Sequence, residues 1–174
     1  MESGMEVVFR ERKVMRWGER CYDACGAYFL TICTKEKKCL LSEIVGDGAL
    51  DVPQPRLTAA GKVLEKYLQS ADKMERVTVD HYVIMPNHLH VILFVTEQAD
   101  GKDGTSGAPS PTNEIVPRFV AVLKRLCNKE IGENVFQRSY HDHIIRDRKD
   151  YDEHVKYICE NPLRWQFDPL YVLE

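Results

Sequence analysis

The segment His88-Leu89-His90 contains two histidines separated by a single apolar residue. Side chains in a β-strand alternate between the two faces, so His88 and His90 would point the same way, with Cβ atoms about 7 Å apart. Two imidazoles at that spacing can converge on one cation. The pattern is short, and two half-exposed strand histidines without a metal would give the same sequence. A metal site and a pair of surface histidines therefore both remain possible interpretations of these residues.

A second group of reactive side chains lies near the C-terminus, where Tyr157 and Asn161 are four residues apart. On a helix they would share one face. A tyrosine beside a metal site can attack phosphorus, but its free pKa near 10 means that a cation or a base must activate it. The amide oxygen of Asn161 is a hard ligand suited to Mg²⁺ or Mn²⁺. A core-packed tyrosine and a helix-capping asparagine would explain the same two positions.

A competing pair of histidines occurs at His141-Asp142-His143. Its charged middle residue predicts a strand that is polar on both faces. Basic residues surround it, and basic and aromatic side chains interleaved in this way suit single-stranded nucleic acid. A solvated strand end is an equally good interpretation. The surrounding basic residues are Arg138, Arg146, Arg148 and Lys149.

Hydrophobic periodicity indicates the elements that must position these residues. Segments rich in aromatic and β-branched residues predict strands, and apolar stripes at helical spacing predict helices. Strands are expected at 26–34, 77–85, 88–96 and 135–146, and helices from Thr58 onward, at 113–130 and at 150–160. The order β-α-β-β-α-β-α is that of an antiparallel ferredoxin-like split βαβ sheet with one added helix. We therefore expect an α+β fold with the helices on one face.

The 174 residues fit a single domain, 1–174, with a Gly/Ser/Pro-rich mobile loop at 97–112. No run approaches the roughly 20 apolar residues of a membrane span, and no secretory signal is visible, so a cytoplasmic protein is expected. The net charge of −3 argues against a protein that coats DNA through bulk charge, although it permits a local basic groove. The six cysteines do not form a zinc-finger pattern.

A line of basic residues on the second predicted helix could form such a groove. Arg118, Arg125 and Lys129 follow one line of that helix, and Arg138 and Arg146 belong to the next predicted strand. If they face the histidines, they predict where DNA phosphates bind.

Several segments resemble the REP-associated tyrosine transposases, relatives of the single-tyrosine insertion-sequence transposases. The segment HYVIMPNHLHVILF resembles their HUH motif, in which a hydrophobic residue separates two histidines. The segments GAYFLTICT, VFQRSYHDHIIR and DYDEHVKYICENPLRW also resemble family blocks in the same order, so the resemblance extends from about Arg12 to Trp165.

The resemblance implies a ferredoxin-like fold with His88 and His90 on a central strand. It places the nucleophile at Tyr157 and the third metal position at Asn161, where related enzymes use Gln. It implies cleavage and strand transfer on single-stranded or hairpin DNA, through a covalent 5′-phosphotyrosine and with Mg²⁺ or Mn²⁺. The protein would act as a monomer or a homodimer.

Two other functions remain in competition with strand transfer. One is a non-catalytic nucleic-acid-binding module on the same fold, although the chain lacks the aromatic pattern of RNA-binding RRM domains. The other is a metal-dependent hydrolase that activates water, in which Tyr157 is structural. Only strand transfer leaves DNA covalently attached to the protein.

Overall fold

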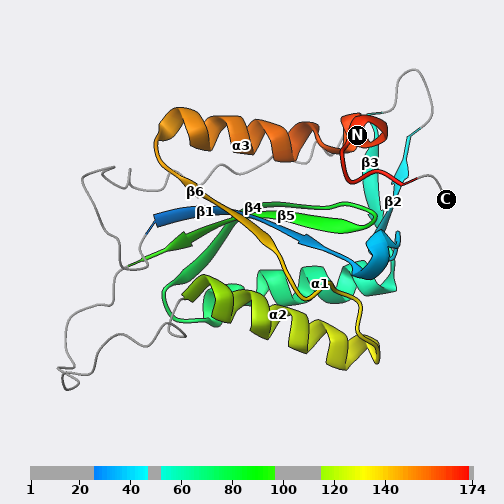
Figure 1. The fold of residues 1–174 in the computed structure, drawn as a ribbon, viewed down its shortest axis with the longest axis horizontal. Coiled ribbons are helices and arrows are strands. Elements are labelled where there is room, and N and C mark those ends of the chain that lie inside the picture. Colours follow the sequence, from blue (N-terminus) through cyan, green and yellow to red (C-terminus); the bar gives the residue numbers. More distant parts are fainter. Residues whose placement is uncertain (1–25, 47–51, 97–114, 173–174) are drawn as a thin grey trace, which may run out of the picture.

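The computed structural model describes residues 26–46, 52–96 and 115–172, and shows an antiparallel sheet between two helical layers (Figure 1). The strands are β1 Gly26–Cys33, β2 Ser42–Val45, β3 Gln54–Leu57, β4 Val77–Ile84, β5 His88–Val95 and β6 His141–Ile145. The α-helices are α1 Ala59–Gln69, α2 Ile115–Ile131 and α3 Arg148–Glu160. Three short 3₁₀ helices are η1 Lys35–Lys37, η2 Ala71–Lys73 and η3 Pro162–Phe167.

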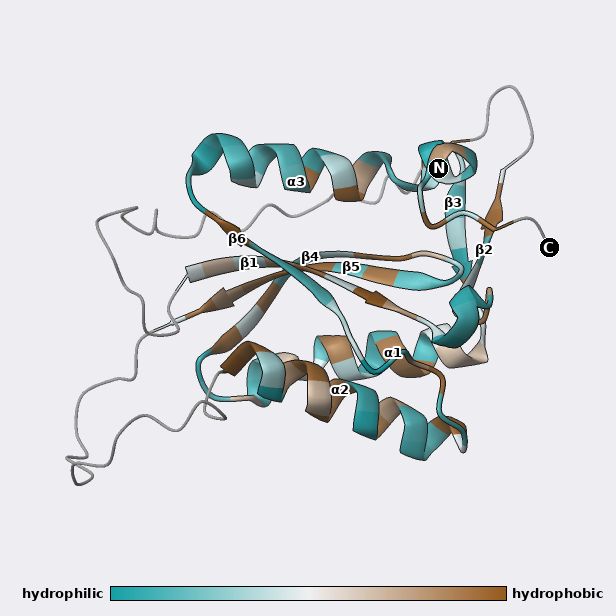
Figure 2. Ribbon diagram, viewed as in Figure 1, coloured by the Kyte–Doolittle hydropathy of each residue, from teal (hydrophilic) through white to brown (hydrophobic). Residues whose placement is uncertain are grey.

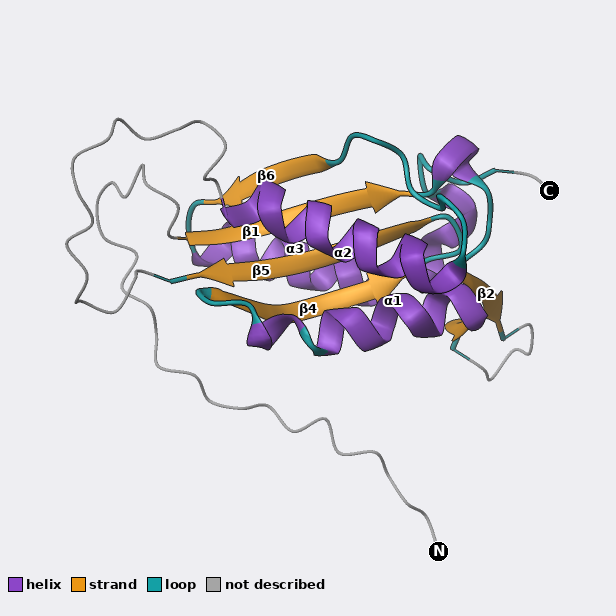
Figure 3. Cartoon of the chain, turned by 90° about the horizontal axis from the view of Figure 1, so that it is seen from below, coloured by secondary structure: helices purple, strands orange, loops and turns teal. Residues whose placement is uncertain are grey.

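The main sheet has the strand order β4-β5-β1-β6, and every neighbouring pair is antiparallel (Figure 3). The helix between β1 and β4 crosses over β5, and the helix between β5 and β6 crosses over β1. This is the split βαβ topology of a ferredoxin-like sheet, so the predicted α+β fold class is confirmed. The two central strands are β5, which carries His88 and His90, and β1.

The helices cover both faces of the sheet, so the expectation of helices on one face is wrong. The α1 and α2 helices cover one face, and α3 covers the other (Figure 1). Alternation along β5 explains this. Leu89 and Val91 pack in the cluster that includes α1 and α2, whereas Ile92 packs with Ile158 of α3 and with Trp165 of η3. Because the second face is also apolar, it needs its own cover.

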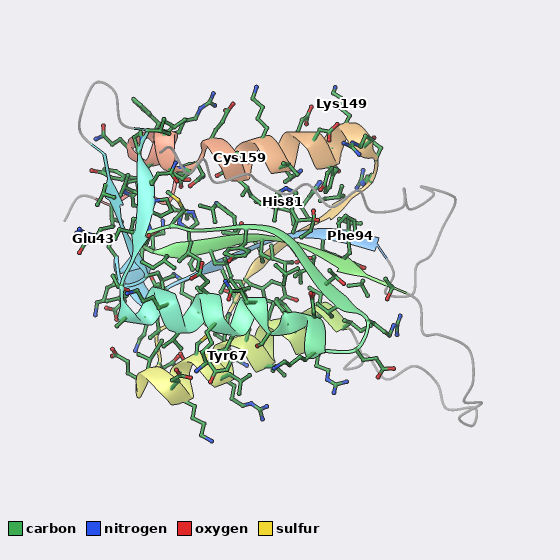
Figure 4. The ribbon with its side chains drawn as sticks, turned by 180° about the vertical axis from the view of Figure 1, so that it is seen from behind. Glu43, Tyr67, His81, Phe94, Lys149 and Cys159 are labelled. Carbon is green, nitrogen blue, oxygen red and sulfur yellow. The ribbon has the colours of Figure 1, made fainter. Side chains whose placement is uncertain are left out.

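The α3 helix, which covers the second face, is more hydrophilic along its length than α1 and α2 are (Figure 2). Ile158 is the only residue of α3 that is fully buried in the described structure. The N-terminal half of α3 is held instead by the Tyr151 hydroxyl, which donates to Asp80 Oδ2 on β4 at 2.6 Å. His81, beside Asp80, lies on the α3 side of β4 (Figure 4).

The helix expected from Thr58 onward is confirmed as α1, and Thr58 is its N-cap. The Thr58 hydroxyl accepts a hydrogen bond from the Gly61 backbone N–H at 3.1 Å and donates to the carbonyl of Leu40 at 2.6 Å. The helix lies so close to the chain at Leu41 that a Cβ atom on Gly61 would be 2.0 Å from the Leu41 carbonyl oxygen. Only glycine fits at this contact.

Three local predictions need correction or fall outside the described residues. The segment between the strand expected at 26–34 and the helix expected from Thr58, for which no strand is predicted, contributes the paired strands β2 and β3. The strand expected at 135–146 is shorter, because only His141–Ile145 pairs regularly with β1. Before it, Lys124 of α2 holds the chain in a non-extended path by donating to three successive carbonyls, those of residues 137–139. The loop predicted at 97–112 lies outside the described residues.

Within the described part of the chain, no helix is both long enough and apolar enough to span a membrane.

Candidate metal centre and nucleophile

His88 and His90 lie on the α3 face of the central strand β5, where both are almost completely buried. Their exposed fractions are 0% and 3%, and their ring centroids are 4.4 Å apart. The Phe29 ring of β1 stacks on His90 at 5.1 Å, and Trp165 lies 5.9 Å from His88. The predicted sharing of one strand face is confirmed. The histidines are not half-exposed, as the alternative interpretation would require.

Hydrogen bonds determine which ring nitrogen of His88 is available to bind a metal ion. Asn87 Oδ1, which can only accept, lies 2.8 Å from His88 Nδ1. The amide orientation of Asn87 is set because its Nδ2 donates to the carbonyls of Lys37 and Leu170. Nδ1 of His88 therefore carries the proton, and neutral His88 has its lone pair on Nε2.

His90 has an equivalent arrangement with a different partner. Its Nδ1 lies 2.9 Å from Thr31 Oγ1 on β1, the residue directly opposite in the strand register. The tautomer in which Nδ1–H donates to Thr31 leaves the lone pair on Nε2. Such partners commonly orient the histidine ligands of metals.

Burial keeps both imidazoles neutral. It lowers the pKa of His88 to about 4, against a smaller opposing effect of the Asp168 carboxylate, and it also lowers the pKa of His90 well below its ordinary value. At neutral pH both rings are therefore uncharged and can offer electron pairs to a cation.

Among the described residues, the buried side-chain atoms without a hydrogen-bond partner are His88 Nε2, His90 Nε2 and Asn161 Oδ1. In the tautomers above, all three offer lone pairs and none offers a proton. Leaving such atoms buried and unpaired costs about 1–3 kcal/mol each, and a cation bound by all three atoms would offset this cost. Asp168 adds a carboxylate, and ligand atoms of His88, His90 and Asp168 lie within 4.8 Å of one another. These residues fit a divalent cation that accepts mixed nitrogen and oxygen ligands.

Asn161 and Asp168 are held together after the end of α3. Asn161, the C-cap of α3, is only 3% exposed, and its Nδ2 donates to Asp168 Oδ2 at 3.0 Å. This bond leaves the amide oxygen of Asn161 available as a ligand. The second oxygen of Asp168 accepts from the Leu170 backbone N–H.

Tyr157 lies beside this cluster and remains open to solvent. Its side chain is 41% exposed, its ring centroid is 5.1 Å from that of His90, and its hydroxyl donates to Asp168 Oδ2 at 3.4 Å. Partial burial, assisted by Asp168, raises its pKa, so the hydroxyl is protonated at neutral pH. The interpretation of Tyr157 as a core residue does not agree with this exposure.

Two other tyrosines, Tyr151 and Tyr140, lie away from His90. The Tyr151 hydroxyl is bonded to Asp80, and burial together with that carboxylate raises its pKa. Tyr140 packs against the cluster on the α1 and α2 side of the sheet, with Lys124 Nζ 5.9 Å from its ring centroid. Of the three, Tyr157 is the one whose ring contacts His90.

A pocket of about 470 Å³ opens onto Tyr157, His90 and Asp168. Its wall includes His141 from β6 and His154 from α3. The second histidine pair of the sequence therefore borders the same side of the sheet. His143, the other member of that pair, does not face the buried histidines, and it contacts Asp150 and His154 instead.

The structure separates the predicted DNA-binding residues into two groups. Arg118, Arg125 and Lys129 belong to α2, on the sheet face opposite His88 and His90. Arg146 lies at the junction between β6 and α3, and Arg138 lies in the segment before β6. The α2 group therefore does not face the histidines, and the DNA-binding role of each residue stays a prediction.

Sequence reasoning missed Asp168 and the residues that orient the histidines. Asp168 follows Asn161 by seven residues, and only the turn of η3 brings it back to the site. Thr31 is recognisable only through the β1–β5 register, which the sequence does not specify. Asn87 could have been noticed, because it directly precedes the first histidine.

Comparisons with known proteins identify relatives across nearly the whole chain. An uncharacterized protein of Haemophilus influenzae is 35% identical over 92% of this chain and 93% of its own length. The REP-associated tyrosine transposase of Escherichia coli K12 is 26% identical over 83% of this chain and 71% of its own length. No protein-family model matches the chain.

The fold is also found in a solved structure of a REP-associated tyrosine transposase bound to a REP hairpin. That protein is 21% identical to this chain, and the match has a TM-score of 0.58 over 88% of this chain and 76% of the other.

Proposed function

Because this chain belongs to the REP-associated tyrosine transposase family, we propose that it cleaves and transfers DNA strands with Tyr157 as the nucleophile and a divalent cation as cofactor. The cation is Mg²⁺ or Mn²⁺, held by His88, His90 and Asn161, with Asp168 as an additional ligand. The substrate is single-stranded or hairpin DNA.

The observation that carries the proposal is the position of a partly exposed tyrosine beside three buried polar atoms that lack hydrogen-bond partners. His88 Nε2, His90 Nε2 and Asn161 Oδ1 lack partners, and Tyr157 is joined to the same cluster through Asp168. A structural role for this cluster would leave the cost of those unpaired atoms without compensation.

When bound, the cation would polarise the scissile phosphate and offset the charge that develops on it. The Tyr157 oxygen attacks phosphorus, a new oxygen–phosphorus bond forms, and the bond to the 3′ oxygen breaks. The tyrosine proton leaves and the 3′ oxygen gains one, so the products are a 5′-phosphotyrosine and a free 3′-OH. Attack by another 3′-OH reverses these bonds and joins strands without an external energy source.

The residues around Tyr157 and the two histidines have separate roles in this reaction. Asp168 orients the Tyr157 hydroxyl through its hydrogen bond. Phe29 and Trp165 pack beside the histidine rings and keep water from their buried sides. The pocket that opens onto Tyr157 gives the scissile phosphate access from solvent.

Two observations support DNA as the substrate. The relative with the matching fold is bound to a REP hairpin, and the pocket beside Tyr157 carries His141 and His154, whose rings can contact phosphates and bases. We extend the hairpin substrate to this chain on that basis.

The test is a trapping experiment with Tyr157→Phe on a DNA hairpin that carries single-stranded flanks. The wild-type chain should form a covalent DNA adduct in the presence of Mn²⁺ or Mg²⁺, whereas Tyr157→Phe should form none because the attacking oxygen is missing. Noncovalent DNA binding should persist, since the ring and its contacts remain. Gel shift and mass spectrometry of the trapped peptide measure both.

Tyr151→Phe serves as the matched control, because it removes a hydroxyl from the same helix without touching the histidine cluster. It should still form the adduct. An adduct that survives in Tyr157→Phe would exclude this nucleophile. DNA binding without any adduct in the wild-type chain would favour the non-catalytic module.

A further inference from the structure

A second group of metal-binding side chains lies outside the buried centre, where β6 meets the first turns of α3. His143 comes from β6, and Asp150 and His154 come from α3. Ligand atoms of the three residues lie within 4.8 Å of one another. We propose that this group is a separate binding site for a late first-row divalent ion such as Zn²⁺.

The distances within the group are close to those that a bound ion requires. Zinc binds imidazole nitrogens and carboxylate oxygens at roughly 2.0–2.2 Å, so the ligand atoms of a tetrahedral site are about 3.3 Å apart. Asp150 Oδ2 lies 2.9 Å from His143 Nε2, and Asp150 Oδ1 lies 3.0 Å from His154 Nδ1. Each of these two carboxylate–imidazole distances would need to lengthen by only a few tenths of an ångström to reach that value.

Two hydrogen bonds made by Asp150 and His154 affect how these residues could move to bind an ion. The Asp150 carboxylate accepts from the Arg146 backbone N–H at 3.0 Å, which holds one oxygen in place. His154 Nδ1 lies 2.8 Å from the Asp150 backbone carbonyl, a bond that the ion would replace. The rings of His143 and His154 are neighbours, with centroids 4.7 Å apart and planes 19° apart.

The exposure of the ligands distinguishes this site from the buried centre, which also pairs two histidines with one aspartate. Two imidazoles and one carboxylate leave a coordination position for water, and nitrogen ligands favour Zn²⁺ over Mg²⁺. His143 is 45% exposed, so an ion can enter from solvent. Phe29 lies between the two sites: its ring contacts both His154, at 4.5 Å, and His90, at 5.1 Å. The ions would therefore not form a bridged pair.

The position of the site gives the ion a mechanical role. It would fasten β6 to the N-terminal turns of α3, the helix that carries Tyr157 two turns later. Ion binding would stabilise this junction whether or not the chain cleaves DNA, so the inference does not depend on the proposed function.

The experiment is a calorimetric titration of the chelator-treated full chain with Zn²⁺ in the absence of DNA. His143→Ala should take up one tightly bound ion fewer per chain than the wild type. Asp150→Asn should lower the affinity for that same ion more than about 100-fold, since even changes to outer-shell partners of metal ligands lower metal affinity about 10- to 100-fold. Folding of each variant is checked by circular dichroism, and the exposure of His143 predicts that His143→Ala folds.

His81→Ala is the matched control, because His81 forms the same kind of histidine–aspartate pair on β4 without a second histidine. It should bind as many ions as the wild type. Cobalt(II) provides a second readout: its visible absorption in a low-coordinate site should be present in the wild type and reduced in His143→Ala. Equal zinc stoichiometry in the wild type and His143→Ala, or an equal loss in His81→Ala, would overturn the site.

Discussion

At the scale of single residues, the two buried histidines each have one nitrogen with a partner and one without. Asn87 and Thr31 occupy the Nδ1 positions, and both Nε2 atoms lack partners. This division of roles is what a ligand histidine requires, because the bonded nitrogen fixes the tautomer and the ring orientation. The orienting residues should therefore influence metal affinity without contacting the ion.

Thr31→Val tests this influence, because valine keeps the shape of threonine and removes only the hydroxyl. We expect Mn²⁺ affinity to fall about 10- to 100-fold, while the unfolding free energy changes by about 1 kcal/mol. Titration calorimetry and denaturant unfolding measure the two effects. Thr78→Val on β4 is the control, since Thr78 lies opposite Phe94, away from the histidines. Equal affinity in Thr31→Val and wild type would remove Thr31 from the metal site.

The depressed histidine pKa values predict how the metal-free chain responds to acid. In the unfolded chain a histidine gains its proton near pH 6.5, whereas folded His88 gains it only near pH 4. Between these values the unfolded state binds more protons, so the unfolding free energy should fall as the pH falls through this window. For His88 alone the shift corresponds to about 3 kcal/mol.

Urea unfolding in the presence of a chelator, repeated at several pH values, measures this dependence. His88→Gln should flatten the curve between pH 6.5 and 4, because glutamine does not titrate. If the variant keeps the slope of the wild type, other groups control acid stability and the burial of His88 costs less than its pKa indicates.

At the scale of elements, α1 packs so closely against the chain at Leu41 that helix propensity does not predict the effect of substituting Gly61. Alanine normally stabilises a helix interior by about 1 kcal/mol relative to glycine. Gly61 is an exception, since its added Cβ would lie 2.0 Å from the Leu41 carbonyl oxygen. The helix could accept a side chain there only by moving away from the loop that Thr58 also contacts.

Gly61→Ala should therefore destabilise the fold by at least about 2 kcal/mol, the range of overpacked substitutions. Thermal and urea unfolding measure the loss. Gly132→Ala, at the end of α2, has strained backbone at φ +89° but open space around its Cβ, so it should cost less. A stabilised Gly61→Ala variant would show that α1 does not pack against this loop in solution.

At the scale of the whole molecule, the sheet separates two surfaces with different tasks. The α1 and α2 layer closes the larger apolar core, whereas the α3 side carries the buried histidines, Tyr157 and the pocket. DNA that reaches Tyr157 must approach on the α3 side. Basic residues near α3 should therefore matter more for DNA binding than those on α2.

We expect Arg146→Ala to reduce the salt dependence of DNA binding by about one unit of slope, the effect of one lost phosphate contact. Arg125→Ala is the comparison on α2 and should leave the slope almost unchanged. Fluorescence anisotropy at several salt concentrations measures both. The opposite result, with a smaller slope only in Arg125→Ala, would place the DNA on the α2 side.

The sequence alone determined the features that depend on local spacing. Alternation along 88–95 placed His88 and His90 on one face and the leucines on the other, and helical spacing placed Tyr157 with Asn161. The element order predicted a ferredoxin-like sheet, because crossover connections in such a series allow few topologies. The family resemblance likewise rests on short sequence segments that occur in the same order along the chain.

Only the tertiary structure decided what depends on residues far apart in the chain. Thr31 meets His90 through strand register, and Asp168 returns to the site through the turn of η3. The placement of α3 opposite α2, which moved three predicted DNA-binding residues away from the histidines, followed from the apolar character of both sheet faces. Hydrophobic patterning shows which side of an element is buried, but it does not identify the partner that buries it.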